Sequence, residues 1–364
     1  RLVKVAEALA DAGAEVTLIY ASPDTATPPE GPFTLVRVDA AYRPSTHPVW
    51  PVRVVANLWR EFVTGNRRMA RLATEAEADA YHAHFLATLL PAYIAARRRG
   101  AALVFDTRDL FIDAAYAMWP WWRTRYYRML ERVLIRRADA VLAVSEPMGQ
   151  VFRERYGIEA PTVVMNGPYE CTTEVRPVAS PVRLFFQGAF RHNRNLSGLV
   201  RAMAMLKGKA TLTLQGWGDM ETELRDVVRE LGLADTVHFR ERCDPRDVIS
   251  CASEYDIGVI SYRADTLNLQ TTVPNKLLDY VGAGLAVAAS DLPGHRSIIE
   301  GSGFGVLIDP TSDETLARDL GELVSDPERI ARMKAAAVEA APGLSWAAQA
   351  EKLVDVYVGL VGDR

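Results

Sequence analysis

The second half of the chain alternates short apolar runs with amphipathic segments, and this alternation limits the fold more than any other feature. Apolar runs typical of buried strands lie at 183–188, 210–216, 236–241, 255–260, 285–289 and 304–309. Apolar residues recur at helical spacing in the stretches between them, at 195–206, 219–231, 244–252, 277–281 and 311–325. Strands that alternate with helices indicate an α/β fold with a doubly wound parallel sheet.

The first half repeats the same alternation with longer connections. Strand patterns lie at 15–21, 34–38, 80–85, 101–106, within 138–148 and at 161–168. Helical patterns lie at 1–14, 49–73, 88–100 and 117–137. Two successive α/β halves predict two Rossmann-like domains with an interdomain cleft, and ligands of such sheets bind at the carboxyl ends of the strands.

A segment without periodicity, 169–181, contains Pro177 and Pro181 and is interpreted as the linker between the domains. We therefore expect an N-terminal domain at 1–168 and a C-terminal domain at 182–342. The last helix, at 343–364, is expected to pack back on the first domain. Because a parallel sheet normally begins with a strand and this chain opens with a helix, we expect the first strand to be missing.

Composition places the chain among globular proteins and excludes several classes. Of its 364 residues 49% are apolar and 24% charged, and no apolar run reaches the roughly 18–20 residues of a membrane span. The opening segment does not resemble a secretory signal. Three cysteines without metal-type spacing favour a reduced, cytoplasmic setting, and a net charge of −4 argues against nucleic acid as a partner.

The stretch 271–294 has the pattern of an anion-binding βα unit. Pro274 suits a first helical turn, and Gly284 suits a left-handed helix end. A helix start at 271–276 would present backbone N–H groups beside Lys276, while Asp279 could accept hydrogen bonds from sugar hydroxyls. A phosphate site beside a hydroxyl site suggests a nucleotide-sugar. The alternative is an ordinary βα unit whose charged residues are solvated.

Polar side chains gather where two strands of the first half end. His82 and His84 are two residues apart, so they share a face of their strand. With no third ligand nearby in sequence, the two histidines favour polar lining of a cleft over a metal site; capping of the strand end is the alternative. Asp106 and Asp109 follow the strand at 101–106, at the edge where open α/β sheets bind ligands.

The helix at 117–137 combines tryptophan and tyrosine with arginine. Over 123–137 it has six arginines and Glu131 as its one acidic residue. Such a helix can lie on an anionic membrane surface or hold a lipid-linked acceptor, which predicts a peripheral position on the inner face of the plasma membrane. The alternative is a core helix with a solvated basic face.

Taken in order, these segments resemble the retaining glycosyltransferases of the GT-B fold, the "group 1" or family 4 class. The resemblance is carried by 187–203, 215–239, 255–262 and 274–294. The opening helix and strand, 138–148, 164–168 and 345–357 also fit, so the match covers nearly the whole chain.

The resemblance implies a donor site in the second domain. In the family, a Gly-containing strand end and the basic residues after it hold the donor diphosphate, which corresponds here to Gly188, Arg194 and the nearby Arg191. Ala189 stands where the family often has arginine. Lys276 is expected to hold the diphosphate together with Arg194.

The family's two glutamates, separated by seven residues, correspond to Thr271 and Asp279. Asp279 is expected to bind the ribose hydroxyls. The Thr271 hydroxyl, with the N–H groups of Thr272 and Val273, is expected to hold the donor sugar or phosphate in place of a glutamate. Residues of the base site correspond to Glu241 and Arg242.

On the acceptor side, Asp106 aligns with a strand end where many members have histidine. Asp106, His84 and Asp109 are therefore expected to bind the acceptor or handle its proton. The resemblance implies a hexosyltransferase (EC 2.4) that acts with retention by front-face displacement, in which the leaving diphosphate takes the acceptor proton. It implies no metal and no cofactor, since Arg, Lys and helix N-termini neutralise the phosphates and no Asp-x-Asp motif is present.

The motif Pro-x-Lys-x-x-Asp-Tyr at 274–280 favours sugar transfer in bacterial cell-surface polysaccharide synthesis, to a saccharide or lipid-linked acceptor. Two other functions stay open. One is a nucleotide-sugar epimerase of the same architecture, which would need more acid and base groups than this sequence offers. The other is a degenerate, non-catalytic sugar-nucleotide-binding protein, which the Thr271 replacement favours.

Overall fold

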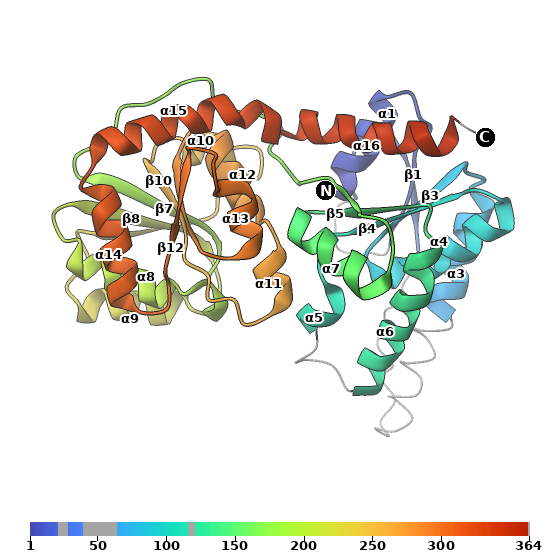
Figure 1. Cartoon of the computed structure of the whole chain (residues 1–364), viewed down its shortest axis with the longest axis horizontal. Helices are drawn as coiled ribbons and strands as arrows, with labels where there is room; N and C mark the ends of the chain where they lie inside the picture. The colour runs from blue at the N-terminus through green and yellow to red at the C-terminus, as the bar shows by residue number, and fades with distance from the viewer. Residues whose placement is uncertain (21–27, 39–63, 116–120, 363–364) are drawn as a thin grey trace. The chain divides into compact units, whose positions relative to one another are not determined.

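The computed structural model describes residues 1–20, 28–38, 64–115 and 121–362. The chain divides into two compact units, each built from parallel strands and helices (Figure 1). The first comprises Arg1–Val144, Gly149–Val164 and Ala350–Arg364, and the second comprises Ser145–Met148 and Met165–Gln349.

The sheet of the first unit has the strand order β3-β4-β5-β6, and β1 and β2 form a separate parallel pair. The separate pair consists of β1 (Thr17–Tyr20) and β2 (Thr34–Arg37). The four strands of the sheet are β3 (Ala80–His84), β4 (Ala102–Thr107), β5 (Ala140–Ala143) and β6 (Thr162–Val163). All six residues of β4 are buried, which explains its continuous apolar run. The register pairs His84 with Asp106 at the carboxyl ends of β3 and β4.

Helices of the first unit cover this sheet. They are α1 (Leu2–Asp11), α3 (Asn66–Glu75), α4 (Leu86–Arg99), α5 (Phe111–Ala115), α6 (Trp121–Leu134), η2 (Ile135–Arg137) and most of α7 (Glu146–Tyr156) and α16 (Trp346–Val361). Helix α4 packs on β3 and β4 and ends at Gly100, whose φ is 67°. The predicted helices at 49–73 and 117–137 lie partly outside the described residues.

The sheet of the second unit has the order β12-β11-β10-β7-β8-β9 (Figure 1). Its strands are β7 (Val182–Ala189), β8 (Ala210–Trp217), β9 (Val237–Arg240), β10 (Ile257–Ile260), β11 (Ala286–Ser290) and β12 (Gly305–Ile308). From β7 the chain proceeds outward on one side through β8 and β9. It then returns to the other side of β7 with β10 and proceeds outward through β11 and β12. The order therefore reverses between β7 and β10, and ligands of open α/β sheets bind at the carboxyl ends flanking such a reversal.

Helices cover both faces of this sheet. They are η3 (His192–Arg194), α8 (Leu196–Met205), α9 (Glu221–Glu230), α10 (Val248–Ala252), α11 (Leu267–Thr271), α12 (Asn275–Gly282), α13 (Pro293–Ile299), α14 (Asp313–Val324) and α15 (Pro327–Leu344). Helix α8 packs with α9 and α14, whereas α12 packs with α10 and α15. No helix within the described ranges combines the length and apolar composition needed to cross a bilayer.

One expectation for this unit is wrong. A single helix start at 271–276 was expected, but Thr271 ends the short helix α11, and α12 begins only at Asn275. Pro274 is the N-cap residue of α12, in an extended conformation with φ −72° and ψ 142°. Gly284 has a φ of 71° and takes the left-handed position after the helix, as expected.

Candidate functional site

Lys276, in the first turn of α12, lies beside the carboxyl end of β7. Its Nζ is 3.7 Å from the centroid of the Phe186 ring and 5.4 Å from that of Tyr262. A Cβ on Gly188 would lie 2.9 Å from the same Nζ, so the glycine leaves room for the ammonium group. Burial, followed by repulsion from Arg194, lowers the pKa of Lys276 well below its ordinary value. The residue as a whole is nevertheless half-buried rather than fully enclosed.

Arg194 supplies a second cation to this place. Its guanidinium lies 4.1 Å from the centroid of the Tyr262 ring, and its buried Nη1 has no hydrogen-bond partner. A buried donor without a partner costs free energy, and an anion would satisfy it. Two cations thus lie near one aromatic ring at the sheet's reversal point, an arrangement that suits an anion with at least two charges.

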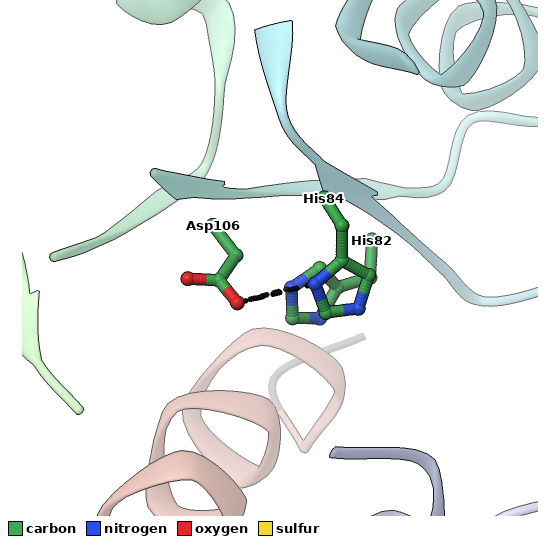
Figure 2. A group of neighbouring side chains, drawn as sticks. All are labelled: His82, His84 and Asp106. Carbon is green, nitrogen blue, oxygen red and sulfur yellow. Dashed lines mark hydrogen bonds and ion pairs between the residues drawn. The ribbon is translucent and has the colours of Figure 1, made fainter. Parts of the chain in front are cut away.

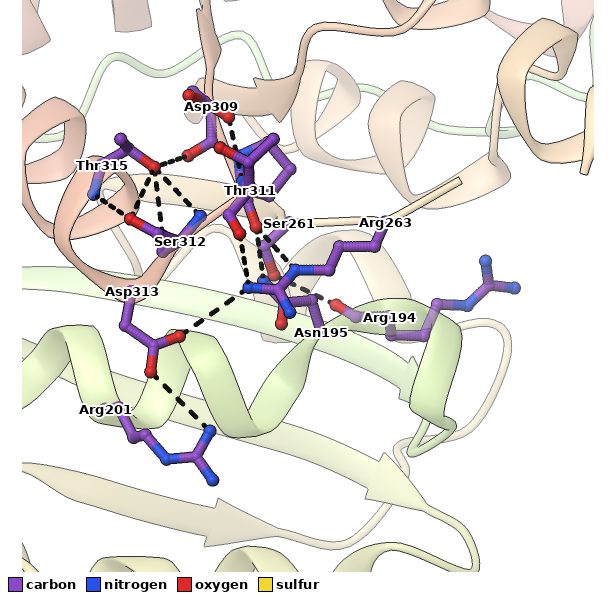
Figure 3. A network of polar contacts seen from close by, with 11 residues as sticks. Arg194, Asn195, Arg201, Ser261, Arg263, Asp309, Thr311, Ser312, Asp313 and Thr315 are labelled. Carbon is purple, nitrogen blue, oxygen red and sulfur yellow. Dashed lines mark hydrogen bonds and ion pairs between the residues drawn. The ribbon is translucent and has the colours of Figure 1, made fainter. Parts of the chain in front are cut away.

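A polar network fixes the backbone of Arg194 (Figure 3). The Ser261 hydroxyl donates to the Arg194 carbonyl at 3.1 Å, and Asn195 follows with a φ of 52°. Arg263 holds the connection into α14 by donating to the carbonyls of Pro310 and Thr311 at 2.7 and 3.2 Å. The guanidinium of Arg194 points away from this network in Figure 3 and is left for the anion site.

Asp279 lies one turn further along α12, on the side that meets β7. Its Oδ2 accepts a hydrogen bond from Gln187 Nε2 at 3.0 Å, while the Tyr280 hydroxyl accepts one from the Gln187 N–H at 2.9 Å. Gln187 immediately precedes Gly188 in β7, so Asp279 is tied to the strand end that carries the glycine. Gly188, Arg194, Lys276 and Asp279, all expected from the sequence, are thus neighbours in one place.

The backbone role expected for 271–273 is wrong for Thr272. Its N–H donates to the Asn268 carbonyl at 3.0 Å and is not available to a ligand. The Thr271 hydroxyl donates to the Leu267 carbonyl at 2.9 Å, and the residue is 4% exposed. Val273 is buried as well. The physical reason is the extra helix α11, whose last turn uses the Thr272 N–H and the Thr271 hydroxyl.

The remaining residues expected at the donor site lie at the surface. Arg191, Glu241 and Arg242 are exposed, and the Arg242 guanidinium lies 5.2 Å from the centroid of the Trp217 ring. Arg191 is the extended residue that precedes η3. The Arg191 carbonyl accepts a hydrogen bond from the Arg194 N–H at 3.0 Å, but no described side-chain contact connects the three residues to the Lys276 ammonium or the Arg194 guanidinium.

Sequence reasoning missed Tyr262 and His295, which complete the walls of the anion site. Tyr262 is 1% exposed, and burial raises its pKa to about 12. His295 Nδ1 donates to the Ser290 carbonyl at 2.9 Å, so Nε2, buried without a partner, carries the lone pair. Burial is the first cause that lowers the pKa of His295 to about 4, which keeps it neutral. Tyr262 follows directly after the strand pattern at 255–260, and that position was the available signal.

A second polar cluster, made by Asp106, His82 and His84, lies at the carboxyl ends of β3 and β4 in the first unit (Figure 2). Asp106 is fully buried, and its two carboxylate oxygens accept hydrogen bonds from Arg1 at 2.8 and 2.9 Å. Its Oδ2 also lies 3.2 Å from His84 Nδ1. Burial would raise the pKa of Asp106, but its partners His82, His84 and Arg1 hold it well below the usual range.

The histidines of this cluster are stacked, with ring centroids 4.1 Å apart and planes at 15°. Burial, together with the neighbouring His82, lowers the pKa of His84 to about 3, so His84 is neutral near pH 7. His82 Nδ1 lies 2.7 Å from the Tyr357 hydroxyl, and its Nε2 is buried without a partner.

The absence of a third metal ligand beside the histidines was expected and is wrong, because Asp106 comes within 4.8 Å of both. The arrangement nevertheless fits a metal poorly. Imidazole binds a metal through an in-plane lone pair, and two stacked rings aim these lone pairs nearly parallel rather than at one point. The guanidinium of Arg1, close to the carboxylate, would also repel a cation.

Asp109 and Arg108 follow β4. Both are partly exposed, and the Arg108 guanidinium lies 3.7 Å from the centroid of the Phe85 ring. The Thr107 hydroxyl donates to the Asp109 carbonyl at 3.1 Å, which fixes the backbone of the turn. Of the three acceptor-side residues expected, His84 and Asp106 are in direct contact, and Asp109 lies on the same strand end as Asp106.

Comparison with known proteins agrees with this architecture. The family model "Glycosyltransferase Family 4" matches residues 1–168, and "Glycosyl transferases group 1" matches residues 175–340. The D-inositol 3-phosphate glycosyltransferase of Thermobispora bispora is 30% identical over 134 residues, which are 37% of this chain and 30% of that protein. The aligned part thus spans under a third of that relative's length.

Solved structures resemble the chain over most of its length. Sucrose-phosphate synthase from Thermosynechococcus elongatus superposes with a TM-score of 0.74 at 18% identity, covering 99% of this chain and 92% of that one. Anabaena HepE in complex with UDP gives a TM-score of 0.67 at 18% identity, covering 81% and 82%. At such identities the likeness concerns the fold alone, and it confirms the expected pair of Rossmann-like domains. With both halves matched by family models, the chain belongs to the group 1 glycosyltransferases of the GT-B fold.

Proposed function

We propose that this protein transfers a hexose from a nucleoside-diphosphate sugar to a saccharide or lipid-linked acceptor, in bacterial cell-surface polysaccharide synthesis. The observation that carries the donor half is the cation pair Lys276 and Arg194 around the bare strand end at Gly188. The pair suits a diphosphate because two positive charges, one with a buried unsatisfied donor, lie near the same Tyr262 ring. The complex of HepE with UDP supports the same class of donor.

Donor chemistry in this proposal needs no metal. Lys276 and Arg194 neutralise the charge that develops on the diphosphate as the bond to the sugar breaks. Asp279, fixed by Gln187, takes the ribose hydroxyls. The acceptor attacks from the face that the diphosphate leaves, which retains the anomeric configuration.

On the acceptor side, His84, Asp106 and Asp109 have different proposed roles. His84 is a weak base because its pKa is lowered to about 3, so the leaving diphosphate is the better acceptor for the hydroxyl proton. Asp106 is enclosed by Arg1 and His84 and positions the His84 ring. Asp109, which is partly exposed, is the carboxylate that can reach an acceptor hydroxyl.

A transfer assay tests the proposal. The full chain is incubated with UDP- and GDP-hexoses and with oligosaccharide or lipid-extract acceptors, and products are identified by mass spectrometry and NMR. Transfer with retention, lost in Lys276→Met, is the expected result. Conversion of the nucleotide-sugar into its epimer would favour the epimerase, and nucleotide binding without any turnover would favour the non-catalytic binding protein.

The proposal includes an anionic membrane surface as partner, through the outer face of α6. Its exposed residues recur three or four positions apart, as on one side of a helix: Trp121, Arg125, Arg128, Met129, Arg132 and Val133. Trp121 is 77% exposed and Met129 61%. The acidic residue of the helix, Glu131, is 2% exposed and lies on the other side. A cationic face with apolar side chains fits the interface of an anionic bilayer.

Co-sedimentation with phosphatidylglycerol vesicles tests this partner. Replacing Arg125, Arg128 and Arg132 by Ser should weaken binding about 100-fold, since each arginine near an anionic surface contributes about 1 kcal/mol. The matched control replaces Arg225, Arg229 and Arg318, three exposed arginines of the second unit, and should leave binding unchanged. Equal losses in both variants, or none in the first, would remove the membrane from the proposal.

A further inference from the structure

Arg108, the first residue after β4, is a cation whose side chain has no polar partner. Its guanidinium lies 3.7 Å from the centroid of the Phe85 ring, and its Nε is buried without a hydrogen-bond partner. Within the described ranges of the chain, the Arg108 side chain makes no ion pair and no hydrogen bond. A buried donor without a partner costs free energy, and a bound anion would satisfy it.

Phe85, which stacks against this guanidinium, has a strained backbone. Its φ of 76° and ψ of 154° fall in a region that essentially only glycine occupies. The ring is 36% exposed, and the Phe85 N–H donates to the Asp106 carbonyl at 3.4 Å. Backbone strain of this kind concentrates at positions that hold ligands. Here it places a partly exposed ring against the unpaired cation.

Two carboxylates lie near Arg108, but neither forms an ion pair with it. Both oxygens of Asp106 accept hydrogen bonds from Arg1, at 2.8 and 2.9 Å. Burial is the largest cause that lowers the pKa of Arg108, whereas the charges of Asp106 and Asp109 raise it. These acids therefore moderate the cost of the buried cation from a distance and leave its N–H groups without an acceptor.

The position of Arg108 connects it with the acceptor side of the proposed reaction. The register pairs His84 with Asp106, and Phe85 and Arg108 follow these residues at the same strand ends. A guanidinium binds phosphate through paired N–H donors, whereas a neutral sugar hydroxyl needs no cation.

We infer that the acceptor carries a phosphate group and that Arg108, stacked on Phe85, binds this group. The inference rests on the proposed function, because it narrows the saccharide or lipid-linked acceptor to a phosphate ester. A sugar phosphate and a lipid-linked sugar diphosphate both present such a group. Arg108 is thus a binding residue for the acceptor and has no part in the proton transfer.

Titration calorimetry with UDP at saturation tests the inference, because UDP then fills the site at Lys276 and Arg194. The probes are glucose 6-phosphate and farnesyl diphosphate, with glucose as the neutral comparison. Arg108→Gln should weaken the better-bound phosphorylated probe about 10- to 100-fold, since a hydrogen bond to a charged group contributes about 1.5–3 kcal/mol. The probe that binds better distinguishes a sugar phosphate from a lipid-linked acceptor.

Two further variants guard against a loss of folding. Arg108→Lys keeps the charge but not the paired N–H donors, so it should lose less affinity than Arg108→Gln. Arg98→Gln, which replaces an exposed arginine of the same unit, is the matched control and should change nothing. The affinity for UDP itself should be the same in all three variants.

The outcomes separate this inference from the function on which it rests. If the unmodified chain binds UDP but neither phosphorylated probe, the inference is overturned and the donor site stands. Equal affinity for the better probe in Arg108→Gln and Arg98→Gln would also overturn it, as would an equal loss for glucose. Failure of the unmodified chain to bind UDP would overturn the proposed function together with this inference.

Discussion

Two lysines of the second unit place their ammonium groups inside the protein, and their surroundings are opposite. Lys334, in α15, is 1% exposed, and its Nζ donates to Asp256 at 3.0 Å and to the Tyr255 carbonyl at 3.2 Å. Lys276, in α12, faces the rings of Phe186 and Tyr262 and the second cation Arg194. It makes no ion pair within the described part of the chain.

The different surroundings of the two lysines indicate different roles: Lys334 is part of a structural ion pair, whereas Lys276 is suited to bind a ligand. A buried charge is tolerated when it is paired, as Lys334 is with Asp256. Lys276 has its pKa lowered by burial and by Arg194, so the free protein holds its cation at a cost in stability. Asp279 offsets part of this cost, but no described carboxylate forms an ion pair with Lys276, which suits a place where an anion binds.

The largest expected effect is on stability and concerns the paired lysine. Lys334→Met leaves the buried Asp256 with Arg183 and the Ala179 N–H as its described partners and should destabilise the second unit by about 3–5 kcal/mol. Lys276→Met removes an uncompensated charge and should leave the free energy of unfolding equal or higher. Urea denaturation followed by circular dichroism measures both. If the two substitutions lowered the free energy of unfolding by similar amounts, the assignment of a structural role to Lys334 and not to Lys276 would be wrong.

A smaller effect is expected on binding by the neighbours of Lys276. Arg194→Ala and Asp279→Ala should each weaken nucleoside diphosphate binding by about 1–3 kcal/mol, because each removes a charged hydrogen bond. Arg194→Ala should weaken pyrophosphate as well, whereas Asp279→Ala should not, since Asp279 is assigned to the ribose. Calorimetric titration measures the four affinities, with Arg201→Ala as the control. Unchanged nucleotide affinity in both variants would mean that the site is misplaced.

Sequence could predict most of this unit because its strands are buried on both faces. The runs at 183–188, 210–216 and 285–289 all became strands of the parallel sheet, and Lys276 does lie beside Gly188 and near Arg194. Local pattern could not supply His295, which comes to the site from α13 through long-range packing, whereas Tyr262, two residues after β10, could have been found from its place after a strand. Helix α11 was missed because five residues without a clear apolar stripe give no periodic signal.

The acceptor side was harder to predict for a related reason. Asp106 and His84 were placed at strand ends from the sequence alone, and their strands do pair there. Arg1 lies 105 residues before Asp106, and no pattern in either segment predicts their ion pair. That contact helps to enclose the Asp106 carboxylate, which is fully buried.

Protonation of Lys276 gives a third way to distinguish the two lysines. Its pKa is lowered in the free protein, so between that pKa and the ordinary value of about 10.4 the group is partly neutral. A bound diphosphate raises the pKa again, and binding should therefore take up as much as about one proton. Calorimetry of UDP binding in two buffers of different ionisation enthalpy measures the uptake at about pH 9, where a terminal phosphate with a second pKa of about 6 is fully ionised.

The lowered pKa of Lys276 also determines how the stability of the protein changes with pH. In the same pH window the unfolded chain binds more protons than the folded one, so stability falls as pH falls towards the folded-state pKa of Lys276. Lys276→Met should lack both the proton uptake and this dependence. Identical uptake in the variant would assign the proton to another group.

The smallest effect is expected at Thr271. Thr271→Val removes a hydroxyl that donates to Leu267 and should cost about 1 kcal/mol of stability. Donor affinity should stay within the error of the unmodified chain, because the hydroxyl is already used inside α11. A clear loss of affinity for a nucleotide-sugar, measured by calorimetry, would restore Thr271 to the donor site.

We propose that Lys276 lacks an ion-pair partner within the described residues because it binds a diphosphate, and pyrophosphate titration of Lys276→Met tests this most directly. We expect a loss of about 10- to 100-fold, since a hydrogen bond to a charged group contributes about 1.5–3 kcal/mol. The same substitution at Lys209, an exposed lysine of the same unit, should change nothing. Pyrophosphate affinity that is equal in Lys276→Met and in Lys209→Met would contradict the account.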